Sequence, residues 1–163
     1  MKACSFTGHR QIENIRLKPL EELLSRAIDY VYKEGCRTFY TGGALGFDTL
    51  AAKLLIKKRI FCPDIKLIVV IPCVDQSEKW GYSARQMYDY IASNADEVIF
   101  TSETYTKDCM KKRNEKLVEF CDVLIAYSGR AYSGSAQTVR MADKCGKRIY
   151  NLYNTIHRNV YGE

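Results

Sequence analysis

Apolar residues occur along the chain in two patterns, short continuous runs and runs at helical spacing. A continuous run such as Leu67–Ile71 is typical of a parallel strand that is covered on both faces. Apolar residues that recur every three or four positions, as they do over 17–31, predict amphipathic helices. The predicted strands are 1–6, 36–40, 67–71, 97–100, 123–127 and 148–153, and the predicted helices are 17–31, 50–59, 84–91, 107–120 and 135–145.

This alternation of strands and helices predicts an α/β fold with a doubly wound, mainly parallel six-stranded sheet and helices on both faces. We expect residues 1–163 to form a single domain, because the length suits one core and no linker or repeat interrupts it. The tail 157–163 is expected to fray. Loops at the carboxyl ends of the strands should meet at one edge, where such folds bind ligands.

The most informative of these loops is Thr41–Asp48, which joins a predicted strand to a predicted helix. Its glycines, Gly42, Gly43 and Gly46, would let a ligand approach the main chain, and the following helix would point free N–H groups at the same place. Such a turn is a candidate anion site, most often for phosphate. The alternative is a tight turn whose glycines serve packing only.

Composition and charge limit the kinds of ligand and site that we expect. The net charge of +6 is compatible with nucleotides or nucleic acid and does not choose between them. Seven cysteines without paired spacing favour reduced, buried thiols, and only two histidines leave little basis for a metal site. No run reaches membrane-spanning length and no signal peptide is evident, so we expect a cytoplasmic protein without membrane contact.

Several motifs together carry a resemblance to a known family. They are TGHR at 7–10, TGGALGFD at 41–48, IPC at 71–73 followed by Gln76 and Trp80, RN at 113–114, and SGSAQT at 133–138. The chain resembles the YpsA-like branch of the SLOG superfamily, which is similar to the Rossmann-like domain of the DNA-processing protein DprA and to the LOG cytokinin-activating enzymes. The resemblance implies a Rossmann-like fold whose glycine loops bind a nucleotide or nucleotide-derived ligand, and a homodimer.

One motif departs from the LOG pattern. LOG enzymes carry PGGxGTxxE, whose glutamate serves in cleaving the base from the ribose phosphate. The matching stretch here is 132–138, and Thr138 stands where that glutamate would fall. Threonine does not act as a carboxylate base near neutral pH, so LOG-type hydrolysis by the same machinery is not expected.

Two loops flank the glycine turn in the predicted arrangement. Gly8 would let a ligand lie close to the first strand, and Arg10 could reach a phosphate or be only a solvated charge. Gly134 and Ser135 could form a second phosphate clamp at the start of the fifth helix. The alternative for Ser135 is an ordinary helix N-cap.

Arg113 and Asn114 fall on the inward stripe of the fourth helix, between Met110 and Leu117. A buried charge needs a partner. The partner of Arg113 could be a ligand phosphate near the sheet edge, or an internal carboxylate such as 96 or 122.

Three further residues have both a ligand role and a structural alternative. Asp48 could bind a ribose hydroxyl or position a water, or could simply suit the first turn of a helix. Gln76 and Trp80 could read and stack a base, or Trp80 could pack in the core.

The leading hypothesis is a binding protein for a phosphate-bearing small molecule, such as ADP-ribose or NAD, acting as a sensor or as a nucleotide-processing protein. One alternative is a DprA-like protein that binds single-stranded nucleic acid, favoured by the charge balance and the lysine-rich fourth helix. The other is a hydrolase of glycosidic or phosphoester bonds that uses Asp48 or His9. Whether the protein is an enzyme stays open at this point. No resident cofactor is assigned.

Overall fold

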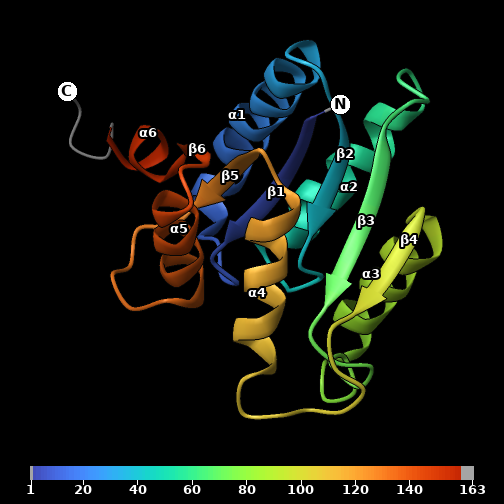
Figure 1. Cartoon of the computed structure of the whole chain (residues 1–163). Helices are drawn as coiled ribbons and strands as arrows, with labels where there is room; N and C mark the ends of the chain where they lie inside the picture. Colours follow the sequence, from blue (N-terminus) through green and yellow to red (C-terminus); the bar gives the residue numbers. More distant parts are fainter. Residues whose placement is uncertain (1, 159–163) are drawn as a thin grey trace.

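A computed structural model of the chain describes residues 2–158. Strands and helices alternate from one end to the other, as the sequence pattern predicts (Figure 1). The strands are β1 (Lys2–Gly8), β2 (Cys36–Thr41), β3 (Lys66–Ile71), β4 (Glu97–Phe100), β5 (Val123–Tyr127) and β6 (Arg148–Asn151). The helices are α1 (Asn14–Lys33), α2 (Phe47–Arg59), α3 (Tyr82–Asn94), α4 (Cys109–Phe120), α5 (Gly134–Lys144) and α6 (Tyr153–His157).

All six strands form one parallel sheet in the order β4-β3-β2-β1-β5-β6. Helices α1, α2 and α3 follow strands that add in one direction from β1, and they cover one face. The chain then returns through α4 to the other side of β1, so α4 and α5 cover the opposite face. Figure 1 shows α4 crossing in front of the sheet. The predicted doubly wound α/β fold is confirmed.

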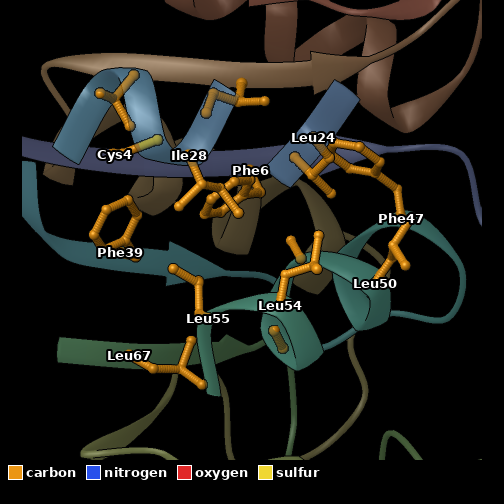
Figure 2. Packing of buried hydrophobic residues seen from close by; sticks show 14 of the residues in the cluster. Cys4, Phe6, Leu24, Ile28, Phe39, Phe47, Leu50, Leu54, Leu55 and Leu67 are labelled. Carbon is orange, nitrogen blue, oxygen red and sulfur yellow. The ribbon is translucent and has the colours of Figure 1, made fainter. Parts of the chain in front are cut away.

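The main core lies between the sheet and the helices α1 and α2 (Figure 2). Phe6 and Phe39 stack side by side on β1 and β2, with their ring centroids 6.2 Å apart. Leu24 and Ile28 from α1 and Leu55 from α2 pack onto them, and all of these side chains are fully buried. The inward stripe of α1 therefore lies where its helical spacing placed it.

The C-terminal part differs from the sequence prediction. The sixth strand ends at Asn151 rather than at residue 153, because Tyr153 begins the short helix α6. The side chain of Asn151 accepts a hydrogen bond from the backbone N–H of Tyr153, which turns the chain out of the strand. His157, expected in a fraying tail, hydrogen bonds to the buried Tyr127. Residue 1 of the predicted first strand and residues 159–163 of that tail lie outside the described residues.

Candidate anion-binding site

A cleft of about 520 Å³ opens at the carboxyl edge of the sheet. It lies where β1 and β5 separate into loops that run to opposite faces, which is the switch point in strand order. We call it the anion cleft. It is lined by Thr7, Gly8, His9, Arg10, Gln11, Ala44, Asp48, Met110, Arg113, Asn114, Leu117, Arg130, Ser133, Gly134 and Ser135.

Helix α4 supplies the central cation of the anion cleft. Arg113 is only 6% exposed, and Asn114 beside it is 7% exposed. The Arg113 guanidinium donates to the carbonyl of Gly42 and, through Nε, to Oδ1 of Asn114 at 2.8 Å. Burial lowers the pKa of Arg113, while the nearby Asp48 raises it. These contacts fix the guanidinium at the wall of the cleft.

The sequence left two carboxylates, Asp96 and Asp122, as alternative partners for Arg113. The structure contradicts both. Asp96 pairs with Arg59 at 2.9 Å, and Asp122 accepts the backbone N–H of Ala3 at 2.8 Å. Both aspartates immediately precede a strand, so they lie at the amino edge of the sheet, opposite the cleft. Within residues 2–158, Arg113 forms no ion pair within 4.0 Å.

Asp48 is the carboxylate that comes nearest to Arg113. A β-carbon placed on Gly42 would lie 2.7 Å from Oδ2 of Asp48 and 2.7 Å from Nη1 of Arg113, so both side chains press against Gly42. Oδ2 accepts the backbone N–H of Ala44 at 3.3 Å, whereas the buried Oδ1 has no partner within residues 2–158. Burial raises the pKa of Asp48 to about 6, against the lowering effect of Arg113. The carboxyl group of Asp48 therefore changes its protonation state close to neutral pH.

Helix α5 presents its amino end to the anion cleft. Its N-cap is Ser133, whose hydroxyl accepts the N–H of Ala136 at 3.1 Å. Ser135, expected either as a phosphate donor or as the N-cap, is therefore not the cap. Its hydroxyl lies in a serine chain, 3.0 Å from the Ser133 hydroxyl and 3.1 Å from that of Ser128. The N–H groups of Gly134 and Ser135 precede the first intrahelical bond and lie at the positive end of the helix dipole.

The loop after β1 is held against the glycine turn. Gly46 has a positive φ of 76° and lies so close to the carbonyls of His9 and Arg10 that a side chain would overlap them. The next amide, Phe47 N–H, donates to the His9 carbonyl at 3.1 Å. A β-carbon on Gly8 would likewise overlap the Phe47 ring. In the free chain, Gly8 and Gly46 therefore serve close packing between the two loops.

His9 joins the loop after β1 to the loop after β5. Its Nε2 accepts the backbone N–H of Gly129 at 2.9 Å. Burial, Arg130 and His157 lower the pKa of His9, so the imidazole is neutral at pH 7. A neutral imidazole whose Nε2 is already an acceptor is a poor general acid.

Gln76 and Trp80 lie behind the glycine turn, and neither they nor Gly43 in the turn line the anion cleft. Gln76 donates to the carbonyl of Gly43 at 3.1 Å. Trp80 packs edge to face on Tyr88, with ring centroids 5.5 Å apart. In this arrangement Gln76 supports the turn from the α3 side of the sheet.

The sequence-predicted residues thus divide into two groups. Those that line the anion cleft are Gly8, Arg10, Asp48, Arg113, Asn114, Gly134 and Ser135, and those that do not are Gly42, Gly43, Gly46, Gln76 and Trp80. Sequence reasoning placed Arg130 and Ser133 in the right loop but did not single them out. Ser133 and Ser135 both stand at the start of the helical run, and serine is a preferred N-cap residue, so the sequence signal for the cap did not distinguish them.

Within residues 2–158, no three His, Cys, Asp or Glu side chains gather in a way that could hold a metal ion. No helix of that part of the chain has both the length and the apolar character needed to cross a membrane.

Fold and cleft together define a Rossmann-like α/β domain with an arginine-lined cleft at its switch point. The family model for YpsA, described as the YspA SLOG family, matches residues 5–156, and the chain belongs to that family. A relative is the UPF0398 protein of Bacillus thuringiensis (strain Al Hakam), which is 26% identical over 163 residues, or 94% of this chain and 89% of the relative.

Solved structures share the fold. DNA processing protein A (DprA) from Streptococcus pneumoniae superposes with a TM-score of 0.67 at 22% identity over 91% of this chain. DprA from Helicobacter pylori, whose structure concerns single-stranded DNA binding, gives 0.64 at 22% identity over 91% of this chain. The chain spans 49% of the first DprA and 63% of the second. At this identity the likeness shows the fold alone.

Proposed function

We propose that the anion cleft binds the phosphate of a nucleotide or a nucleotide-derived small molecule, of which ADP-ribose and NAD are examples. The observation that carries the proposal is Arg113, a buried cation on the cleft wall that has no ion pair within residues 2–158. A buried charge without a counter-charge is unfavourable, and a bound phosphate would supply one.

The surroundings of Arg113 support an anion rather than a cation as ligand. The cleft is also lined by Arg10 and Arg130 and by the amino end of α5. Among residues 2–158, the one carboxyl group in its lining, Asp48, has a pKa of about 6 and is mostly ionised at pH 7, so three arginines face a single carboxylate. An excess of cations together with amides at a helix start favours phosphate.

A negative charge in the glycine turn, as in Gly43→Asp, is one way to test the proposal. The structure favours another position, because Gly43 has a positive φ of 69° and a β-carbon there would lie 3.1 Å from Val69. At Gly134 the nearest atom to an added β-carbon is 3.9 Å away. Gly134→Asp therefore puts a negative charge into the cleft at a helix start, where aspartate is tolerated.

The experiment is calorimetric titration of the wild type and Gly134→Asp with AMP, ADP-ribose and NAD. The matched control is Gly81→Asp, because Gly81 precedes α3, has open space around it and does not line the cleft. We expect Gly134→Asp to lose at least tenfold in affinity and Gly81→Asp to lose none. Binding by neither wild type nor variants would refute the proposal. Tight, salt-dependent binding of a single-stranded oligonucleotide that nucleotides do not displace would instead favour the DprA-like alternative.

A second candidate function is hydrolysis of a bound nucleotide, and Asp48 is the specific reason to consider it. Its pKa of about 6 suits a general base near neutral pH, and its Oδ1 has no partner within residues 2–158. Chromatography of AMP and ADP-ribose after incubation tests it. If Asp48 is the base, Asp48→Asn retains binding and forms no product. If the wild type forms no product, the protein is a binding protein for these ligands.

Two expectations remain predictions. The homodimer implied by the family resemblance is tested by light scattering of the purified protein, and the cytoplasmic location by fractionation of cells that express it.

A further inference from the structure

A second hollow of about 280 Å³ adjoins the anion cleft. We call it the side pocket. It shares His9, Gln11 and Arg130 with the anion cleft, so the two are continuous along one wall. The remainder of its lining is Ile12, Glu13, Tyr127, Tyr153 and His157.

Rings dominate the side pocket. Tyr153 stacks on His157 with ring centroids 3.8 Å apart, and the edge of His9 meets Tyr153 at 5.7 Å. The Tyr127 hydroxyl and Nε2 of His157 lie 2.8 Å apart and share a hydrogen bond. Each ring is thus fixed by a neighbour, which gives the pocket a rigid aromatic wall.

The side pocket differs from the anion cleft in charge. Burial lowers the pKa of His157, and it lowers that of His9 as well, so both imidazoles are neutral at pH 7. Glu13 adds a carboxylate whose side chain is 66% exposed and whose one ion pair within residues 2–158 is to Arg16 at 3.4 Å. Arg130, at the junction with the anion cleft, is the one cation that the described residues place in its lining, and the rest of the lining has neutral rings and a single acidic group. Such a lining favours a flat, uncharged, hydrogen-bonding partner over a second phosphate.

We propose that the side pocket holds the nucleoside part of a ligand whose phosphate lies in the anion cleft, with His9 and Arg130 at the junction. This assignment rests on the proposed function of the anion cleft and adds to it the place and the chemical class of the rest of the ligand. His9 fits the junction, because Nε2 accepts the Gly129 N–H and the proton is therefore on Nδ1, free to donate to a hydroxyl.

The test fills the side pocket and leaves the anion cleft intact. Glu13 lines the side pocket and not the anion cleft, and its side chain is 66% exposed, so Glu13→Trp adds bulk at a position where the fold tolerates it. Glu22→Trp is the matched control, since Glu22 is an exposed glutamate of α1, the helix that begins directly after Glu13, and lies outside both hollows. The probes are AMP and inorganic phosphate, titrated into each protein, with circular dichroism to check folding.

We expect the wild type to bind AMP more tightly than phosphate, and Glu13→Trp to weaken AMP binding by about tenfold while phosphate binding stays the same. Glu22→Trp should match the wild type for both probes. If Glu13→Trp binds AMP as the wild type does, or if a crystal structure with AMP places adenosine outside the side pocket, the inference is wrong and phosphate binding in the anion cleft stands. If the wild type binds neither probe, both proposals fall.

Discussion

Two buried charged side chains, Asp48 and Arg113, meet at Gly42 on the wall of the anion cleft. Burial controls the protonation of both groups, because neither has an ion-pair partner within 4.0 Å among residues 2–158. Burial raises the pKa of the carboxyl group and lowers that of the guanidinium, so both shifts disfavour charge. The free protein is therefore less stable at this site than a neutral pair would make it.

The first prediction concerns the pH dependence of stability. The pKa of Asp48 is about 6 in the folded protein, against an ordinary value of 3.8. Between these values the folded state holds a proton that the unfolded state has released, so stability falls as pH rises from 4 to 6. Relative to the wild type, Asp48→Asn should gain stability over that range by about 3 kcal/mol. Urea denaturation of both proteins at pH 4, 6 and 8 measures this difference in the free energy of unfolding.

The difference in the free energy of unfolding between the two proteins removes the contribution of the other groups that titrate over the same range. Asp29→Asn is a useful control, because Asp29 is 66% exposed and its ion pair with Lys58 is at the surface. A constant difference between wild type and Asp48→Asn from pH 4 to 8 would show that Asp48 has an ordinary pKa in the folded protein.

At the scale of the element, the site depends on how α2 and α5 begin. α5 starts with a side-chain cap from Ser133, whereas α2 starts at Gly46, which has no side chain to offer and a positive φ. Both starts bring backbone amides to the sheet edge. Because one helix start depends on a side chain and the other on the absence of one, we expect different responses to mutation.

Ser133→Ala should destabilise the protein by about 1 kcal/mol, because it removes the acceptor for the Ala136 N–H. Ser83→Ala in α3 is the control, since Ser83 is exposed and the substitution favours the helix. The free energy of unfolding from urea titration distinguishes them. Equal values for the two variants would show that the Ser133 cap contributes nothing.

Gly46→Ala should destabilise the protein by about 1–3 kcal/mol, because alanine is strained at this φ and its methyl group would overlap the carbonyl groups of the loop after β1. Gly134→Ala is the control. Its β-carbon meets no atom closer than 3.9 Å, and alanine favours the helix, so it should leave stability unchanged or slightly raised. Thermal unfolding of both variants checks the contrast, which a tolerated Gly46→Ala would contradict.

At the scale of the whole molecule, the doubly wound sheet covers most of the cysteines. Cys4, Cys36, Cys73, Cys109 and Cys121 are buried, Cys62 is half-buried and Cys145 is exposed. Burial also raises the pKa of the Cys73 thiol to about 11. Both effects slow the reaction of a thiol, because the thiolate is the reactive species.

The native protein should therefore show one fast thiol with a colorimetric disulfide reagent, at Cys145, and a slower one at Cys62. The other five should react only when the protein unfolds. Cys145→Ser should remove the fast phase. Rapid reaction of more than two thiols in the native state would mean that the core opens more readily than this packing implies.

The amino-acid sequence by itself determined the order of the six strands and of helices α1 to α5, the parallel sheet and the edge at which the loops gather, because all three follow from local periodicity and from the rules of βαβ connection. It also placed Arg113 and Asn114 on the buried stripe of their helix, since helical spacing fixes which residues share a face.

Only the tertiary structure decided what those residues meet. The carboxyl group beside Arg113 is Asp48, which comes from the first turn of α2, more than sixty residues earlier, and not Asp96 or Asp122, which are closer in sequence. In the same way, only the assembled fold brings the side chain of Gln76 to the carbonyl of Gly43, to which it donates a hydrogen bond. The adjacency of β1 and β5, which opens the cleft, results from a strand order that no local pattern encodes, because contacts between distant segments depend on how the whole sheet assembles.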